Sequence, residues 1–157
     1  MEGSGARALE DARMGAMSSA FGPSALDRAM ARVGDRWTLQ VVEALLEGPR
    51  RFSELQEVLP AVAPNVLSAR LRRLEQDGLV VAAPYSERPR RHHYRVTEAG
   101  RELAGVVLLL TRWGARDAGE EALGPRHRAC GTALEPRWYC PTCARVTDSP
   151  DDDLVWL

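Results

Sequence analysis

The sequence predicts a mainly helical α+β domain followed by a small His/Cys-rich appendage. Apolar residues recur at helical spacing in five segments between residues 24 and 118, and two β-prone segments flank a basic turn. Three cysteines lie within fourteen residues near the C-terminus. A chain of 157 residues, 45% of them apolar, is long enough to bury a core around these helices.

Residues 1–23 are rich in Gly, Ala and Ser and are predicted to be a flexible leader. They have no continuous apolar core, so they do not have the pattern of a secretory signal. The longest apolar run, Val106–Leu110, is far shorter than the roughly 20 residues that cross a bilayer. We therefore expect a cytoplasmic protein without a membrane span.

The first three helices are predicted from their boundary residues. Ser24 can cap a helix that ends at Gly34, and Asp35 is predicted to cap a second helix. Gly48-Pro49 stops the second helix. The sequence Ser53-Glu-Leu-Gln56 matches the capping-box motif and predicts a short third helix.

A fourth helix is predicted to begin at Pro64, where the missing N–H is not needed, and to end at Gly78. Leu67, Leu71 and Leu74 recur at i, i+4 and i+7, so they must face the core. The opposite face then carries Asn65, Ala69, Arg72, Arg73 and Gln76, with Ser68 at its margin. Arg70 lies nearer the core and is predicted to make a structural ion pair.

A β-hairpin and a last helix complete the domain. Leu79–Tyr85 and His92–Val96 are β-prone, and Ser86–Arg91 between them contain a proline and three arginines, which predicts a hairpin with a basic tip. Thr97 is predicted to cap one long helix that runs to about Ala118. Since this helix is apolar on nearly every side, we expect it to be buried in a homodimer interface.

This order of elements is the winged helix-turn-helix plan. A helix fits the major groove of DNA, and the hairpin can lie over the neighbouring backbone or minor groove. Residues 48–96 carry nine arginines against five carboxylates, which suits double-stranded DNA as the partner. Any single arginine is consistent with an ordinary solvated face. The combination of the winged helix-turn-helix order of elements with the arginines of the helix and the hairpin favours DNA binding. The predicted DNA-binding residues are Arg50, Arg51, Ser53, Asn65, Ser68, Arg72, Arg73, Arg88, Arg90 and Arg91.

Five motifs in order resemble the HxlR-type transcription regulators, which are relatives of the MarR group. These motifs are Leu26–Thr38, Gly48–Leu55, Asn65–Leu74, Gly78–Val80 and Tyr94–Gly100. The resemblance implies a homodimeric, sequence-specific repressor or activator over residues 24–118, without catalytic activity. Such a dimer would bind a pseudo-palindromic operator and respond to a small-molecule or redox effector. Many members carry a redox-sensing cysteine just before the first helix; Ser24 stands at that position here, so the resemblance does not extend to that thiol.

Two short ligand pairs lie after the winged-helix segment. His127-x2-Cys130 and Cys140-x2-Cys143 are separated by nine residues, and one imidazole with three thiolates completes a closed tetrahedral shell. This pattern predicts a structural Zn²⁺ site in a zinc-ribbon-like module over residues 125–146. The alternative is a free Cys130 thiol, with Cys140 and Cys143 unpaired or in a reversible disulfide. Residues 147–157 form an acidic tail.

The sequence argues against two other classes of function, a protein-docking adapter and an enzyme. A zinc-ribbon adapter would use the winged helix to dock a protein, but the arginine distribution argues against this. The sequence contains no HExxH motif, phosphate loop, nucleophile elbow or paired catalytic carboxylates, and the predicted metal shell has no open position. We therefore expect no enzymatic activity.

Overall fold

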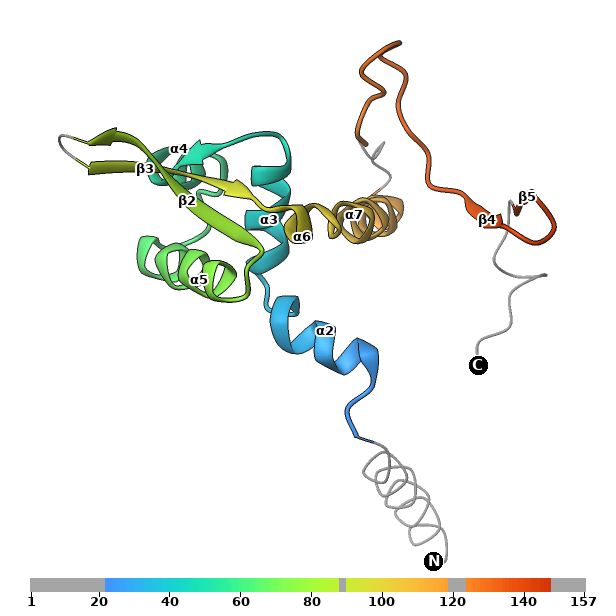
Figure 1. Ribbon diagram of the computed structural model, residues 1–157, viewed down its shortest axis with the longest axis horizontal. Coiled ribbons are helices and arrows are strands. Elements are labelled where there is room, and N and C mark those ends of the chain that lie inside the picture. Colours follow the sequence, from blue (N-terminus) through green and yellow to red (C-terminus); the bar gives the residue numbers. More distant parts are fainter. Residues whose placement is uncertain (1–21, 88–89, 119–123, 148–157) are drawn as a thin grey trace, which may run out of the picture. The chain divides into compact units, whose positions relative to one another are not determined.

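The computed structural model describes residues 22–87, 90–118 and 124–147 (Figure 1). The chain divides into two compact units, of which the first ends at Thr97 and the second begins at Glu98. Most of the leader and the acidic tail lie outside the described residues. The first unit comprises α2 (Ala25–Val33), α3 (Thr38–Leu46), β1 (Arg50–Arg51), α4 (Phe52–Val58), α5 (Pro64–Gln76), β2 (Val80–Glu87) and β3 (Arg90–Val96). The second comprises α6 (Glu98–Arg101), α7 (Ala104–Ala118), β4 (Trp138–Cys140) and β5 (Arg145–Thr147).

The strands of the first unit form an antiparallel sheet in the order β1-β3-β2. The hairpin is longer than predicted, because pairing continues past an irregularity near Pro84 to the pair Glu87 and Arg90. Strand β1 was not predicted, since two residues are too few to show an alternating pattern. Its Arg50 pairs with Tyr94 of β3.

The core of the first unit lies where α3 and α5 contact each other and the sheet (Figure 1). Its completely buried side chains are Leu45, Leu55, Leu67, Leu71, Leu74, Val41, Val42 and Thr38. The prediction that three leucines of α5 face the core is confirmed. Each buried leucine contributes about 1.5–3 kcal/mol of hydrophobic free energy, so this stripe fixes which face of α5 points outward.

The boundaries of α2 and α5 are confirmed. The hydroxyl of Ser24 accepts a hydrogen bond from the backbone N–H of Asp27, 3.0 Å away, and Gly34 ends α2. Pro64 is the first residue of α5, and Gly78 follows the helix with φ +70°, the left-handed conformation that glycine adopts most readily.

Two predicted caps differ from the structure. α3 begins at Thr38, although the carboxylate of Asp35 does accept the N–H groups of Trp37 and Thr38 at 3.0 and 3.2 Å. The capping box assigned to Ser53 is wrong. The chain leaves β1 directly into α4, so the extended Arg51 is the N-cap, and the Glu54 carboxylate accepts its N–H at 2.6 Å.

The single long helix predicted after Thr97 is also wrong. α6 ends at Arg101, two residues in a turn follow, and α7 begins at Ala104. The hydroxyl of Thr97 donates to the carbonyl of Gly78 at 2.7 Å, which ties the end of β3 to the start of β2. Within the described ranges, no helix combines the length and apolarity needed to cross a membrane.

Candidate nucleic-acid interface

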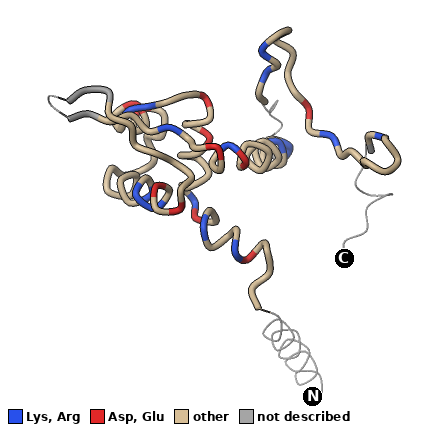
Figure 2. The backbone as a smooth tube through the Cα atoms, in the orientation of Figure 1, with Lys and Arg blue, Asp and Glu red and all other residues tan. Residues whose placement is uncertain are grey.

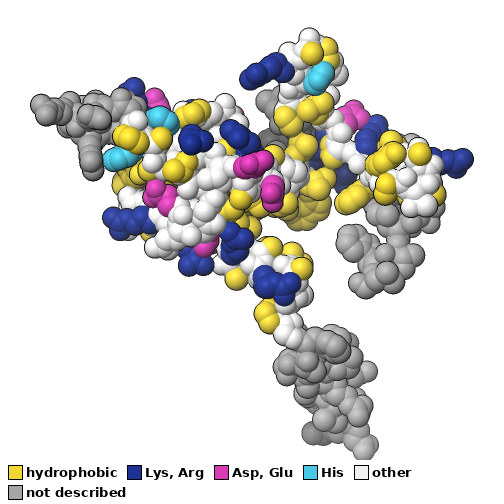
Figure 3. Space-filling view, viewed as in Figure 1, with side chains coloured by type: hydrophobic (Ala, Val, Ile, Leu, Met, Phe, Trp, Pro, Cys, Tyr) yellow, Lys and Arg dark blue, Asp and Glu magenta, His cyan; other side chains and the backbone are white. Residues whose placement is uncertain are grey.

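The outward face of α5 gathers polar and basic side chains, as predicted. Asn65, Arg72 and Arg73 are exposed and Ser68 is half-buried, whereas the leucines on the other side of the helix are at most 1% exposed. The tube and space-filling views show arginines on this helix (Figures 2 and 3). The helix is thirteen residues long, or about 20 Å, which is enough to lie along a major groove.

Arg72 and Arg73 differ in their surroundings. Arg73 lies with its Nε 3.1 Å from Oδ2 of Asp77, one turn further along, and half of its side chain remains exposed. In the part of the chain that the structure describes, Arg72 has no carboxylate within ion-pair distance. Of the two arginines on this face, Arg72 is therefore the one whose guanidinium does not have to leave a carboxylate of its own chain before it binds a phosphate or a base.

Arg70 performs the structural role predicted for it. Its Nε lies 3.1 Å from Oδ1 of Asp35, in the turn between α2 and α3. Burial disfavours ionisation of Asp35, but hydrogen bonds from the Thr38 hydroxyl and the Trp37 N–H, together with the Arg70 charge, hold its pKa below the usual value. The charged carboxylate thus joins α5 to the start of α3.

The end of α5 is held by a contact that sequence reasoning missed. Nη2 of Arg32 on α2 donates to the carbonyl of Asp77 at 2.9 Å. The two residues are 45 positions apart, so no local pattern could indicate the contact. A basic residue bound to the last carbonyls of a helix also opposes the negative end of its dipole.

The two arginines of β1 differ in how far their side chains are bound to the rest of the chain. Nε of Arg50 donates to the carbonyl of Ala44 at 2.8 Å, and the guanidinium pairs with Glu47. Arg51 is half exposed and lies 4.0 Å from the Glu54 carboxylate. Ser53 is exposed in the first turn of α4. Arg50 is thus bound to the end of α3, whereas Arg51 and Ser53 face solvent.

The hairpin carries the other predicted phosphate contacts. Arg90 and Arg91 are in β3, paired with Glu87 and Ser86 of β2, rather than in a loop. Arg88 lies outside the described residues. The basic tip is therefore shorter than the six residues predicted from the sequence.

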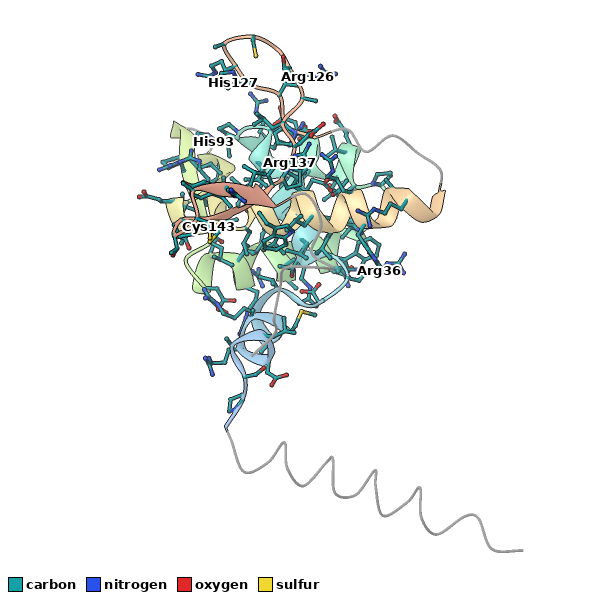
Figure 4. All side chains as sticks on the ribbon, turned by 90° about the vertical axis from the view of Figure 1, so that its right-hand side faces the viewer. Arg36, His93, Arg126, His127, Arg137 and Cys143 are labelled. Atoms are coloured by element: carbon teal, nitrogen blue, oxygen red, sulfur yellow. The ribbon has the colours of Figure 1, made fainter. Side chains whose placement is uncertain are left out.

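The first predicted metal-ligand pair lies on a tight turn of the second unit. Nδ1 of His127 is 3.3 Å from Sγ of Cys130, and the Thr132 hydroxyl is 3.3 Å from the same sulfur (Figure 4). Hydrogen bonding with the Thr132 side chain and backbone and with His127 lowers the pKa of the Cys130 thiol to about 7.

The second pair lies where β4 turns into β5. Hydrogen bonds from the backbone and side chain of Cys143 and from the backbone of Thr142 lower the pKa of Cys140. Among the residues that the structure describes, no three or more His, Cys, Asp or Glu side chains lie close enough to hold one ion. The four predicted ligands therefore form two separate pairs.

The core that α3, α4 and α5 form with the sheet, the outward face of α5 and the β2–β3 hairpin define a winged helix-turn-helix protein. The chain belongs to the HxlR-like helix-turn-helix family, whose profile matches residues 32–122. It is thereby a transcriptional regulator of the helix-turn-helix type and not an enzyme.

Individual proteins that the chain resembles are also helix-turn-helix regulators or transcription factors. The chain is 39% identical over 130 residues to the HTH-type transcriptional regulator Rv3095 of Mycobacterium tuberculosis, covering 81% of this chain and 82% of that one. The crystal structure of YtcD from Bacillus subtilis matches 62% of this chain and 99% of its own, with 30% identity and a TM-score of 0.58. The transcription factor PA1374 of Pseudomonas aeruginosa matches 82% of this chain and 88% of its own, with 29% identity and a TM-score of 0.58.

Proposed function

We propose that the protein is a homodimer that places two copies of α5 in successive major grooves of a pseudo-palindromic operator. The observation that carries this proposal is the division of α5 into a buried leucine stripe and an exposed face with Asn65, Arg72 and Arg73. A helix anchored in this way presents its polar side chains at a fixed angle to the base edges.

The side chains of the proposed surface divide by the chemistry they can perform. Asn65 and Ser68 suit hydrogen bonds to base edges, and Arg72 and Arg73 suit forked contacts to guanine or nearby phosphates. The wing arginines, Arg88, Arg90 and Arg91, would position the duplex through phosphates without reading sequence. Arg51 and Ser53 would add phosphate contacts, whereas we assign Arg50 to holding β1 against α3, since its guanidinium already binds Ala44 and Glu47.

Dimer formation is supported by apolar side chains that each chain leaves exposed. On α7, Leu110 is 48% and Trp113 is 65% exposed, and on α2, Leu26 is 69% exposed. Burying such side chains against a second copy would stabilise a symmetric dimer. A small-molecule or redox effector would act by changing the separation of the two α5 helices. We propose that the regulator acts on chromosomal DNA in the cytoplasm, at the nucleoid.

The proposal is tested by capturing fragments of the source genome with the full-length protein and sequencing what is retained. Footprinting of an enriched fragment should then show two protected half-sites whose centres are about one helical turn, roughly 34–36 Å, apart. The operator proposal is wrong if every enriched fragment binds no more tightly than an unrelated duplex of the same length. Transcription from the enriched promoters, with and without the protein, decides between repression and activation.

A further inference from the structure

We propose that one structural Zn²⁺ ion joins the two turns of the C-terminal segment 124–147. Its ligands are the imidazole and the three thiolates of this segment: His127, Cys130, Cys140 and Cys143. This role is independent of the DNA-binding surface on α5, because it concerns a different unit of the chain.

The first pair is at the tip of a small hairpin. Arg126 and Ala133 form an antiparallel bridge, and the N–H of His127 donates to the carbonyl of Thr132 at 2.8 Å. The N–H of Gly131 returns to the carbonyl of His127 at 2.7 Å. Gly131, which directly follows the second ligand, has φ +71°.

The second pair repeats this arrangement. Strands β4 and β5 pair from Trp138 and Thr147 to Cys140 and Arg145, so the two cysteines lie at the tip of the hairpin. Ala144 directly follows the second ligand and has φ +51°, as Gly131 does in the first turn. A left-handed conformation costs a residue other than glycine about 1–2 kcal/mol, so a turn that keeps it requires a compensating interaction.

The segment lacks an apolar core that could hold the two hairpins together. None of residues 125–146 is buried, and Trp138 and Tyr139 are 47% and 60% exposed. A module of this size needs a cross-link, such as a metal ion or a disulfide, to be stable. Two turns that each present a pair of soft donors at x2 spacing provide the four ligands of a tetrahedral zinc site.

Each cysteine would bind as its thiolate, so binding releases thiol protons and leaves a centre with a net charge of −1, from one divalent cation and three thiolates. Arginines lie close in sequence to both ligand pairs, and their positive charge is opposite to that of the centre: Arg126, Arg128, Arg137 and Arg145. Nη1 of Arg126 already donates to the carbonyl of Gly131 at 3.0 Å. Because the two pairs are separate in the structure, metal binding would bring the hairpins together and order the segment, as in other small metal-dependent modules.

The test measures the zinc content of the full-length protein, purified without chelator, and the absorption spectrum of its Co²⁺-substituted form. We expect about one zinc per chain, tetrahedral d–d bands and sulfur-to-cobalt charge transfer. The variants Cys140→Ser and His127→Asn should lose the metal. Arg128→Gln is the matched control, since it changes the same turn without removing a ligand, and should keep it.

A second measurement guards against variants that simply misfold. Chelation of the wild-type protein should speed proteolytic cleavage within residues 124–147, while cleavage elsewhere stays unchanged. The proposal is overturned if wild-type protein holds no more zinc than Cys140→Ser, or if alkylation and mass spectrometry show a disulfide between Cys140 and Cys143 in metal-free protein. Failure of DNA binding with zinc retained would contradict only the operator proposal.

Discussion

Arg70 of α5 lies with its Nε 3.1 Å from the carboxylate of Asp35, which precedes α3. The same carboxylate accepts the hydroxyl of Thr38, whose side chain is only 1% exposed. The ion pair itself is about one-third exposed, so its Coulomb energy is screened by solvent. Its main effect is to fix the helix that we propose to enter DNA against the helix that supports it.

Replacing Asp35 by alanine should therefore destabilise the domain. The buried Thr38 hydroxyl would lose its acceptor and Arg70 its partner, which we expect to cost about 1–3 kcal/mol in the free energy of unfolding. Urea denaturation followed by circular dichroism measures the change. Glu57→Ala, an exposed carboxylate on α4, is the control and should leave the urea midpoint nearly unchanged.

The same carboxylate gives the stability a pH dependence of known sign. The pKa of Asp35 is lower in the folded chain than its ordinary value, so its contribution is present above the unfolded pKa of about 3.9 and is lost as pH falls through the folded pKa. The stability difference between wild type and Asp35→Asn should shrink on acidification below pH 4. A difference that grows on acidification would contradict this assignment.

Arg72→Gln should weaken operator binding by about 1–3 kcal/mol, because a forked guanidinium contact to guanine is lost. Fluorescence anisotropy with a labelled operator fragment measures the effect. Arg101→Gln removes one positive charge from α6, outside the proposed surface, and should bind like the wild type. Equal losses in the two variants would show that only overall charge matters.

The double variant Leu110→Ser/Trp113→Ser should shift the protein from dimer to monomer, because both side chains are exposed on α7 and each would be buried in the dimer. Size-exclusion chromatography with light scattering gives the mass directly. Val58→Ser, which changes an exposed apolar residue of α4, should remain dimeric. A double variant that stays dimeric would place the interface elsewhere.

The sequence predicts best those features that local spacing controls. The leucine stripe of α5, the Ser24 cap and the start of the helix at Pro64 follow from residues a few positions apart, and the structure has all three. That Arg70 would form an ion pair was also predictable from its place at the edge of the stripe, but its partner Asp35 was not.

Features that depend on distant parts of the chain were missed or misplaced. Ser53 matched a capping pattern, yet strand β1 places the N-cap of α4 at Arg51, two residues earlier, and β1 exists only by pairing with β3. Thr97 resembled a helix cap, but its hydroxyl is bonded to Gly78 nineteen positions away. The bond between Arg32 and Asp77 is likewise set by tertiary packing.

In the proposed mode of binding, arginines on α5 and the wing contact the phosphates of a DNA duplex. Its most direct test is the salt dependence of operator binding by the full-length protein. If the two copies neutralise several phosphates, the logarithm of the association constant should fall linearly with the logarithm of salt concentration, by about 0.9 for each phosphate contacted. A steep negative slope is the predicted result, and a slope near zero would contradict binding through phosphate contacts.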